Sequence, residues 1–83
     1  MQNDNVCAFI INYLSKHLEI PTSAIDATSS FEDAGADSIT LVELAMELEQ
    51  TYDISVPDGT LTTEGTITSA AEELVALPAR QNS

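Results

Sequence analysis

The 83-residue chain is poor in the residue types that build disulfide-rich, metal-binding and nucleic-acid-binding proteins. It has one Cys, one His, no Trp and only two Lys or Arg residues. The single thiol of Cys7 excludes an internal disulfide and a metal cluster made of thiolates. The first residues lack the basic start and apolar run of a signal peptide, and no apolar run approaches the length that spans a bilayer. We therefore expect a cytoplasmic protein without membrane insertion.

Positive charge is almost absent, and the formal net charge is −12. No Lys or Arg lies between Glu19 and Ala79, a stretch that holds all but one of the 14 acidic residues. Such a field repels phosphate backbones and anionic lipid surfaces, which argues against nucleic acid and membranes as partners. Basic protein surfaces and cations are expected instead. The length allows one small domain with a modest core.

A helix predicted from Ser38 to about Tyr52 is the clearest local pattern. Asp37 is a favourable N-cap, because its carboxylate can accept hydrogen bonds from the free amides of the first turn. Residues 39–52 contain no Gly or Pro and many strong helix formers. Ser38 falls at the first helical position, beside the positive end of the helix dipole, where an attached phosphate group is favoured.

This helix has two apolar faces at the helical period. The face predicted to point toward the core holds Leu41, Leu44, Ala45, Leu48 and Tyr52. The second face lies beside Ser38 and holds Ile39, Val42 and Met46, flanked by Glu43, Glu47 and Glu49. An apolar patch rimmed by acids is typical of a protein-docking surface. We therefore predict that the second face is exposed and binds partner proteins.

The chain before this helix is predicted to form one more helix and a long loop. Periodic apolar residues indicate a helix capped by Asn3 or Asp4 that runs to about Leu18. A loop at 21–36 follows, with a short helical turn near residues 22–25. Ile25 and Phe31 are expected to anchor this loop in the core.

The chain after this helix is predicted to hold one short and one regular helix. The short one falls between Asp58 and Glu64, where Gly59 and several Thr residues weaken it. The last helix is expected to start at Thr68 or Ser69, with a capping box formed by residues 69–72. Its expected inner face consists of Ile67, Ala71, Leu74 and Val75.

One stretch of the sequence is similar to a known family. Asp37-Ser38-Ile39, followed by Val42-Glu43-Leu44, Met46, Leu48-Glu49, Tyr52-Asp53-Ile54 and Val56-Pro57, resembles the acyl carrier proteins. The resemblance runs from about Val6 to Leu74 and departs at Ile39, where Leu is commoner. With the predicted helices it indicates an all-α fold: a small four-helix bundle of three main helices plus a short third helix, with a long loop between helices one and two. We expect a single domain over residues 1–83, with an ordered core of about 4–77 and a tail at 78–83.

The resemblance implies a carrier rather than an enzyme. Ser38 would bear a 4′-phosphopantetheine arm that a phosphopantetheinyl transferase attaches from coenzyme A, and Asp37 would contact that transferase. The arm's thiol would hold acyl intermediates as thioesters for fatty acid, polyketide or specialised lipid biosynthesis. Acyl-loading, acyl-transfer and condensing enzymes would bring basic patches to Ile39, Val42, Glu43, Met46, Glu47 and Glu49 of a monomer. The acyl chain would be sheltered by Phe31, Leu44, Leu48 and Ile67.

Three other functions fit the sequence less well. A peptidyl or aminoacyl carrier usually has a small residue or His before the serine, where this chain has Asp37. A calcium-binding loop starting at Asp53 fits poorly, because Pro57 takes a ligand position and Gly59 is misplaced by one residue. A serine enzyme is disfavoured, because His17 is the single candidate base and adjacent helical residues do not face each other. No metal site is predicted, although a weakly cation-binding acidic module remains an alternative.

Overall fold

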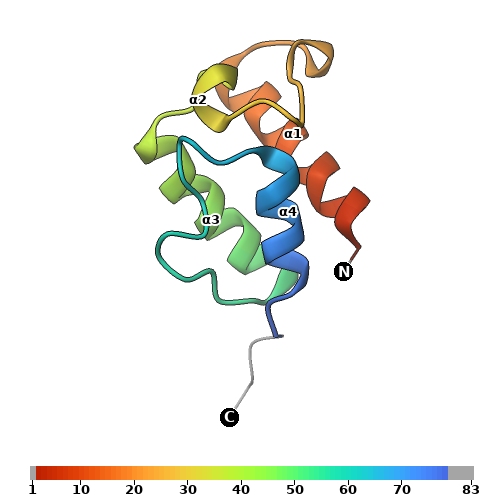
Figure 1. The fold of residues 1–83 in the computed structure, drawn as a ribbon, viewed down its shortest axis with the longest axis vertical. Coiled ribbons are helices and arrows are strands. Elements are labelled where there is room, and N and C mark those ends of the chain that lie inside the picture. Colours follow the sequence, from red (N-terminus) through yellow and green to blue (C-terminus); the bar gives the residue numbers. More distant parts are fainter. Residues whose placement is uncertain (1, 79–83) are drawn as a thin grey trace.

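Residues 2–78 are described by the computed structural model, and they form a small bundle of four α-helices (Figure 1). The elements are α1 (Asn3–Leu18), a 3-10 turn η1 (Thr22–Ala24), α2 (Phe31–Ala34), α3 (Ser38–Tyr52) and α4 (Ile67–Val75). The prediction of an all-α four-helix bundle is confirmed, whereas most of the predicted tail lies outside the described residues. α1 packs chiefly against α4. Within the described chain, no helix is long and apolar enough to cross a bilayer.

α1 has the predicted length but a different start. The predicted cap at Asn3 or Asp4 is wrong, because Asn3 is already helical and Gln2 takes the cap position without a side-chain hydrogen bond. At the other end, Glu19 adopts the left-handed conformation with φ of 58°, and its N–H donates to the Ser15 carbonyl. Pro21 follows directly after this turn, so the helix cannot continue.

The short helix of the bundle lies before α3 and not after it. Ser30 caps α2, since its Oγ accepts a hydrogen bond of 3.0 Å from the Asp33 amide. The predicted helix between Asp58 and Glu64 is wrong, because this stretch forms turns. Gly59 has φ of 89°, outside the helical region, and the β-branched Thr residues around it have low helix propensity.

α4 begins earlier than the predicted caps, Thr68 or Ser69. Thr66 Oγ1 accepts from the Ser69 amide at 3.0 Å, and Ser69 Oγ accepts from the Thr66 amide at 3.3 Å. The capping box therefore joins Thr66 to Ser69, and the predicted box at residues 69–72 is wrong. The earlier start aligns four buried residues on one helical face: Ile67, Ala70, Ala71 and Leu74. Val75, predicted on this face, is half-buried.

All four helices contribute to a single core. Its largest fully buried side chains are Phe31, Ile10, Leu14, Leu44, Leu48, Ile67, Leu74 and Val6. The predicted loop anchors are both in this core, with Phe31 0% exposed and Ile25 7% exposed. The turn predicted near residues 22–25 is present as η1. The long loop is therefore held against the bundle at several points.

Hydrogen bonds join residues 27–32, which include the start of α2, to residues 63–68, which include the start of α4. The Phe31 N–H donates to the Gly65 carbonyl, and the Glu32 N–H donates to the Thr63 carbonyl, both at 2.9 Å. The Thr68 amide and hydroxyl both donate to the Ala27 carbonyl, at 3.0 and 2.9 Å. The Thr-rich segment before α4 therefore braces α2 from outside.

Gly35 makes the turn between α2 and α3. Its φ of 101° lies in the left-handed region that favours glycine, and its N–H donates back to the Glu32 carbonyl. Ala36 then inserts into the core with 4% of its surface exposed. A buried residue directly before Asp37 fixes the point at which α3 begins, so Ser38 is delivered to the surface by a short and well-anchored turn.

Candidate functional site

The N-terminus of α3 is capped by Asp37, as predicted. Asp37 Oδ1 accepts hydrogen bonds from the Thr40 amide at 2.8 Å and from the Thr40 hydroxyl at 2.9 Å. These two bonds hold the pKa of the Asp37 carboxyl below its ordinary value, and the bond from the Thr40 amide has the larger effect. The charge of His17 makes a smaller contribution in the same direction. Thr40 is 5% exposed, so its hydroxyl is committed to the cap.

Replacing Asp37 by Ala should lower the melting temperature at neutral pH, because the first turn of α3 loses its acceptor. Because the pKa is lowered, the cap stabilises the fold fully at pH values above the ordinary Asp pKa of about 3.9. This stabilisation is lost as the pH falls through the pKa of Asp37 in the folded protein. The difference in melting temperature between wild type and Asp37→Ala should therefore become smaller at acidic pH. Asp37→Asn keeps an acceptor and serves as the matched control, with a smaller loss. A difference that stays constant down to about pH 2.5 would contradict this assignment.

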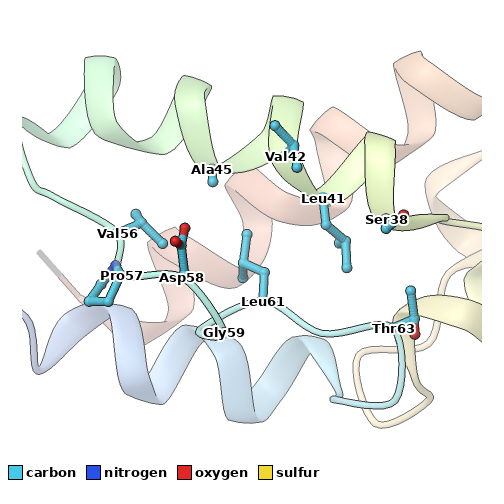
Figure 2. A pocket seen from close by; sticks show the side chains of 10 residues that line it. All are labelled: Ser38, Leu41, Val42, Ala45, Val56, Pro57, Asp58, Gly59, Leu61 and Thr63. Carbon is cyan, nitrogen blue, oxygen red and sulfur yellow. The ribbon is translucent and has the colours of Figure 1, made fainter.

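Ser38 is the first residue of α3, and it is exposed. Free amides of the first turn and the positive end of the helix dipole surround this position, which stabilises a negatively charged substituent. Ser38 lies at one end of a cleft of about 250 Å³ between α3 and the segment that follows it (Figure 2).

The walls of this cleft are largely apolar. Besides Ser38, it is lined by Leu41, Val42, Ala45, Val56, Pro57, Asp58, Gly59, Leu61 and Thr63. Figure 2 shows the side chains of Leu41 and Leu61 directed toward each other across the cleft, with Ser38 and Thr63 at the same end. A flexible chain attached to Ser38 could therefore lie along α3 and be partly shielded from water.

The cleft is not the interior predicted from the sequence. Phe31, Leu44, Leu48 and Ile67 are each 0% exposed and fill the core among themselves and their neighbours. The cleft beside Ser38 lies on another side of α3, between Leu41 and the chain that follows the helix. The prediction that those four residues shelter an acyl chain stays a prediction, and the cleft beside Ser38 is a different place.

The second apolar face of α3 is exposed, as predicted. The exposed fractions are 68% for Ile39, 61% for Val42 and 54% for Met46, and these three are the exposed large apolar side chains of the described chain. The opposite face holds Leu41, Leu44 and Leu48, which are buried. One helix thus presents an apolar strip to solvent directly beside Ser38.

The acidic residues predicted to rim this strip fall on two sides of the helix. Burial raises the pKa of the Tyr13 hydroxyl, and the negative charges of Glu43 and Glu47 raise it further, so both carboxylates lie toward α1. Glu49 lies on the other side, where its Oε2 accepts a 2.9 Å hydrogen bond from the Val56 amide. Glu43 and Glu47 are exposed, whereas Glu49 is half-buried.

The other candidate residues are not assembled into a catalytic or metal site. His17 is exposed, and its ring stacks on Tyr13 with centroids 5.6 Å apart. Burial, followed by the charges of Asp4 and Glu72, raises the pKa of the Cys7 thiol, which disfavours its reactive thiolate form. Within residues 2–78, no group of three or more His, Cys, Asp or Glu side chains is placed to hold a metal ion.

Sequence reasoning missed the far wall of the cleft and the Glu49 contact. The sequence predicts a helix between Asp58 and Glu64, which gives no indication that residues 56–63 line a cleft with Ser38. α2 could have been found, because Ser30 followed three residues later by Asp33 is a helix-start pattern. The Glu49 contact had no such signal, since its partner is a backbone amide whose position depends on the turn between them.

Known proteins match most of this chain. Residues 8–74 match a family model described as the phosphopantetheine attachment site. Over 59 residues the chain is 34% identical to an acyl carrier protein of Prochlorococcus marinus (strain MIT 9515), an alignment that covers 70% of this chain and 74% of that protein. Asp37, Ser38 and the whole of α3 fall within the range matched by the family model.

Proposed function

Because this chain belongs to the acyl carrier protein family, whose phosphopantetheine-attachment domain it contains, we propose that Ser38 is the residue that carries the arm. Proteins of this family are carriers and not enzymes, and their 4′-phosphopantetheine is covalently attached by a phosphopantetheinyl transferase. The observation that carries the proposal is an exposed hydroxyl at the first position of a capped helix, at the mouth of an apolar cleft. The helix terminus favours the phosphodiester there.

The carrier would hold an acyl group as a thioester on the arm. The arm supplies the reactive thiol, and this chain supplies the position of the arm, a shielded surface and recognition by partners. Leu41, Ala45 and Leu61 offer apolar cover along the cleft that has Ser38 at one end. Fatty acid, polyketide and specialised lipid biosynthesis are the pathways in which we propose the carrier acts, as a cytoplasmic monomer. A peptidyl or aminoacyl carrier is disfavoured by Asp37 before the serine.

The direct test is the intact mass before and after incubation with coenzyme A and a broad-specificity phosphopantetheinyl transferase, followed by peptide mapping. We expect a gain equal to one phosphopantetheine, localised to the peptide that contains Ser38. A folded protein that gains no mass, alongside a control carrier that is modified, would overturn the proposal. A gain on another residue would retain the carrier function and refute Ser38.

We further propose that partner enzymes dock on the strip of Ile39, Val42 and Met46 with basic residues directed toward Glu43 and Glu47. Exposure of the strip and of both carboxylates supports this surface. An apolar centre with a charged rim provides contact area, while the charges steer the encounter. Glu49 is a poorer candidate for steering, since its carboxylate is engaged by the Val56 amide.

Reversing two charges on this surface should slow modification by the transferase. We expect Glu43→Lys with Glu47→Lys to lower kcat/KM about 10-fold or more at low ionic strength, with the difference shrinking as salt screens the charges. Glu72→Lys with Glu73→Lys on α4 makes the same change in net charge and is the matched control. Equal losses in both double variants would show that only the net charge matters.

A further inference from the structure

The far wall of the cleft is an irregular segment that makes few hydrogen bonds to the other residues that the structure describes. Residues 55–61 form no helix, and the Thr60 N–H donates to the Pro57 carbonyl within the segment itself. Among described residues, the bond between the Val56 amide and Glu49 is the one hydrogen bond that joins residues 55–61 to another element. Val56 and Leu61 are half-buried, so apolar contacts supply the remaining attachment.

Glu49 occupies a particular position relative to Ser38. Ser38, Val42, Ala45 and Glu49 are spaced by four, three and four residues, which places them along one face of α3. The first three line the cleft, and Glu49 lies one turn beyond Ala45. At about 1.5 Å per residue, Glu49 is roughly 16 Å along the helix from Ser38. Glu49 therefore holds residues 55–61 at the end of the cleft that lies opposite Ser38.

We propose that Glu49 is a positioning residue that holds residues 55–61 against α3 and thereby sets how well the cleft shields a thioester on the arm. The inference rests on the proposed attachment at Ser38 and assigns to Glu49 a role distinct from partner docking. A hydrogen bond from an amide to a carboxylate is stronger than a neutral one, which suits a residue that holds an irregular segment in place. When this bond is lost, the wall moves away from α3 more often and the thioester meets water and small nucleophiles.

Substitutions at Glu49 separate the effect of side-chain length from the effect of charge. Glu49→Ala removes the acceptor, Glu49→Asp keeps the charge on a side chain one methylene shorter, and Glu49→Gln keeps the reach and an acceptor oxygen without the charge. Glu73→Gln is the matched control, because Glu73 is exposed on α4 and the change in net charge is the same as for Glu49→Gln. All five proteins would be loaded with an octanoyl-phosphopantetheine arm, and loss of the thioester to hydroxylamine would be followed by intact mass.

The expected order of cleavage rates is Ala and Asp fastest, Gln intermediate, and wild type and Glu73→Gln slowest. The Ala variant should exceed wild type by on the order of 5-fold, the lower end of usual couplings between a contact and a conformational equilibrium. Equal rates in all five proteins would overturn the inference. So would wild-type behaviour in the Asp variant, because that result would show that charge rather than the contact controls shielding.

A second measurement needs no arm and keeps the inference independent of loading. Amide hydrogen exchange in the unmodified protein should show protection of the Val56 amide that is lost in Glu49→Ala, while the core amides of α3 at Leu44 and Leu48 stay protected. An unprotected Val56 amide in wild type would refute the contact. Failure to load at Ser38, with Val56 protected, would instead refute the proposed attachment site.

Discussion

Replacing Ser38 by Ala should abolish attachment of the arm while leaving the fold intact. The phosphodiester requires a hydroxyl at the first position of α3, and Thr63, at the same end of the cleft, is a half-buried residue outside this helix. The Thr40 hydroxyl is buried against the Asp37 carboxylate, and the Ser30 hydroxyl caps α2. The measurement is the mass gain after incubation with coenzyme A and the transferase, which should fall below detection.

Stability should be almost unchanged in the same variant. Ser38 is exposed, Ala is a strong helix former, and the cap on α3 is made by Asp37 rather than by Ser38. Ser23→Ala is the matched control, because Ser23 is an exposed serine in η1, away from α3, and its variant should be modified at the wild-type rate. Any arm still attached to Ser38→Ala would contradict the assignment, and a large fall in melting temperature would reveal a structural role for this hydroxyl.

The sequence predicts α3 well because several signals coincide there. Asp37 supplies a cap, residues 39–52 contain no helix breaker, and two apolar faces repeat at the helical period. The burial of Leu44 and the exposure of Val42 both follow from that period. The prediction of Ser38 as the attachment site depends on the same residues, so one pattern predicts both the helix and the proposed site.

The ends of the other helices were harder to predict because competing cap signals lie close together. Around the start of α4, Thr66, Thr68 and Ser69 can all act as caps, and a Glu three residues after Ser69 favoured the later start. The observed start is the one that buries Ile67 and extends the apolar face by one turn. Tertiary burial therefore decided between local signals of similar strength.

The far wall of the cleft could not be predicted from local patterns at all. The segment after Asp53 is irregular, and its position depends on Glu49 and on the packing of Val56 and Leu61. The pairing of Thr63 with Glu32 likewise joins residues far apart in sequence through backbone groups, which carry no side-chain signal. Only the assembled fold shows that these residues approach Ser38.

Replacing Phe31 by Ala should have the largest effect on stability of any single change considered. Phe31 is 0% exposed at the start of α2, and its N–H is bonded to Gly65 across the paired loops. Truncating a fully buried Phe costs about 3–5 kcal/mol, partly because of the cavity that remains. Small domains have total stabilities of about 5–15 kcal/mol, so the loss is a large share. We expect the melting temperature to fall by more than about 12 °C.

Phe9→Ala is the matched control for this prediction. Phe9 is half-buried and meets Tyr52 edge to face with ring centroids 5.5 Å apart, so its truncation should cost clearly less. An equal or larger loss in Phe9→Ala would contradict the view that Phe31 anchors the loop. The consequence for function follows from chain order: α2, Gly35 and Ala36 lead directly to Asp37 and Ser38. Loosening Phe31 should therefore slow modification of Ser38 even below the melting temperature, which Phe9→Ala should not do.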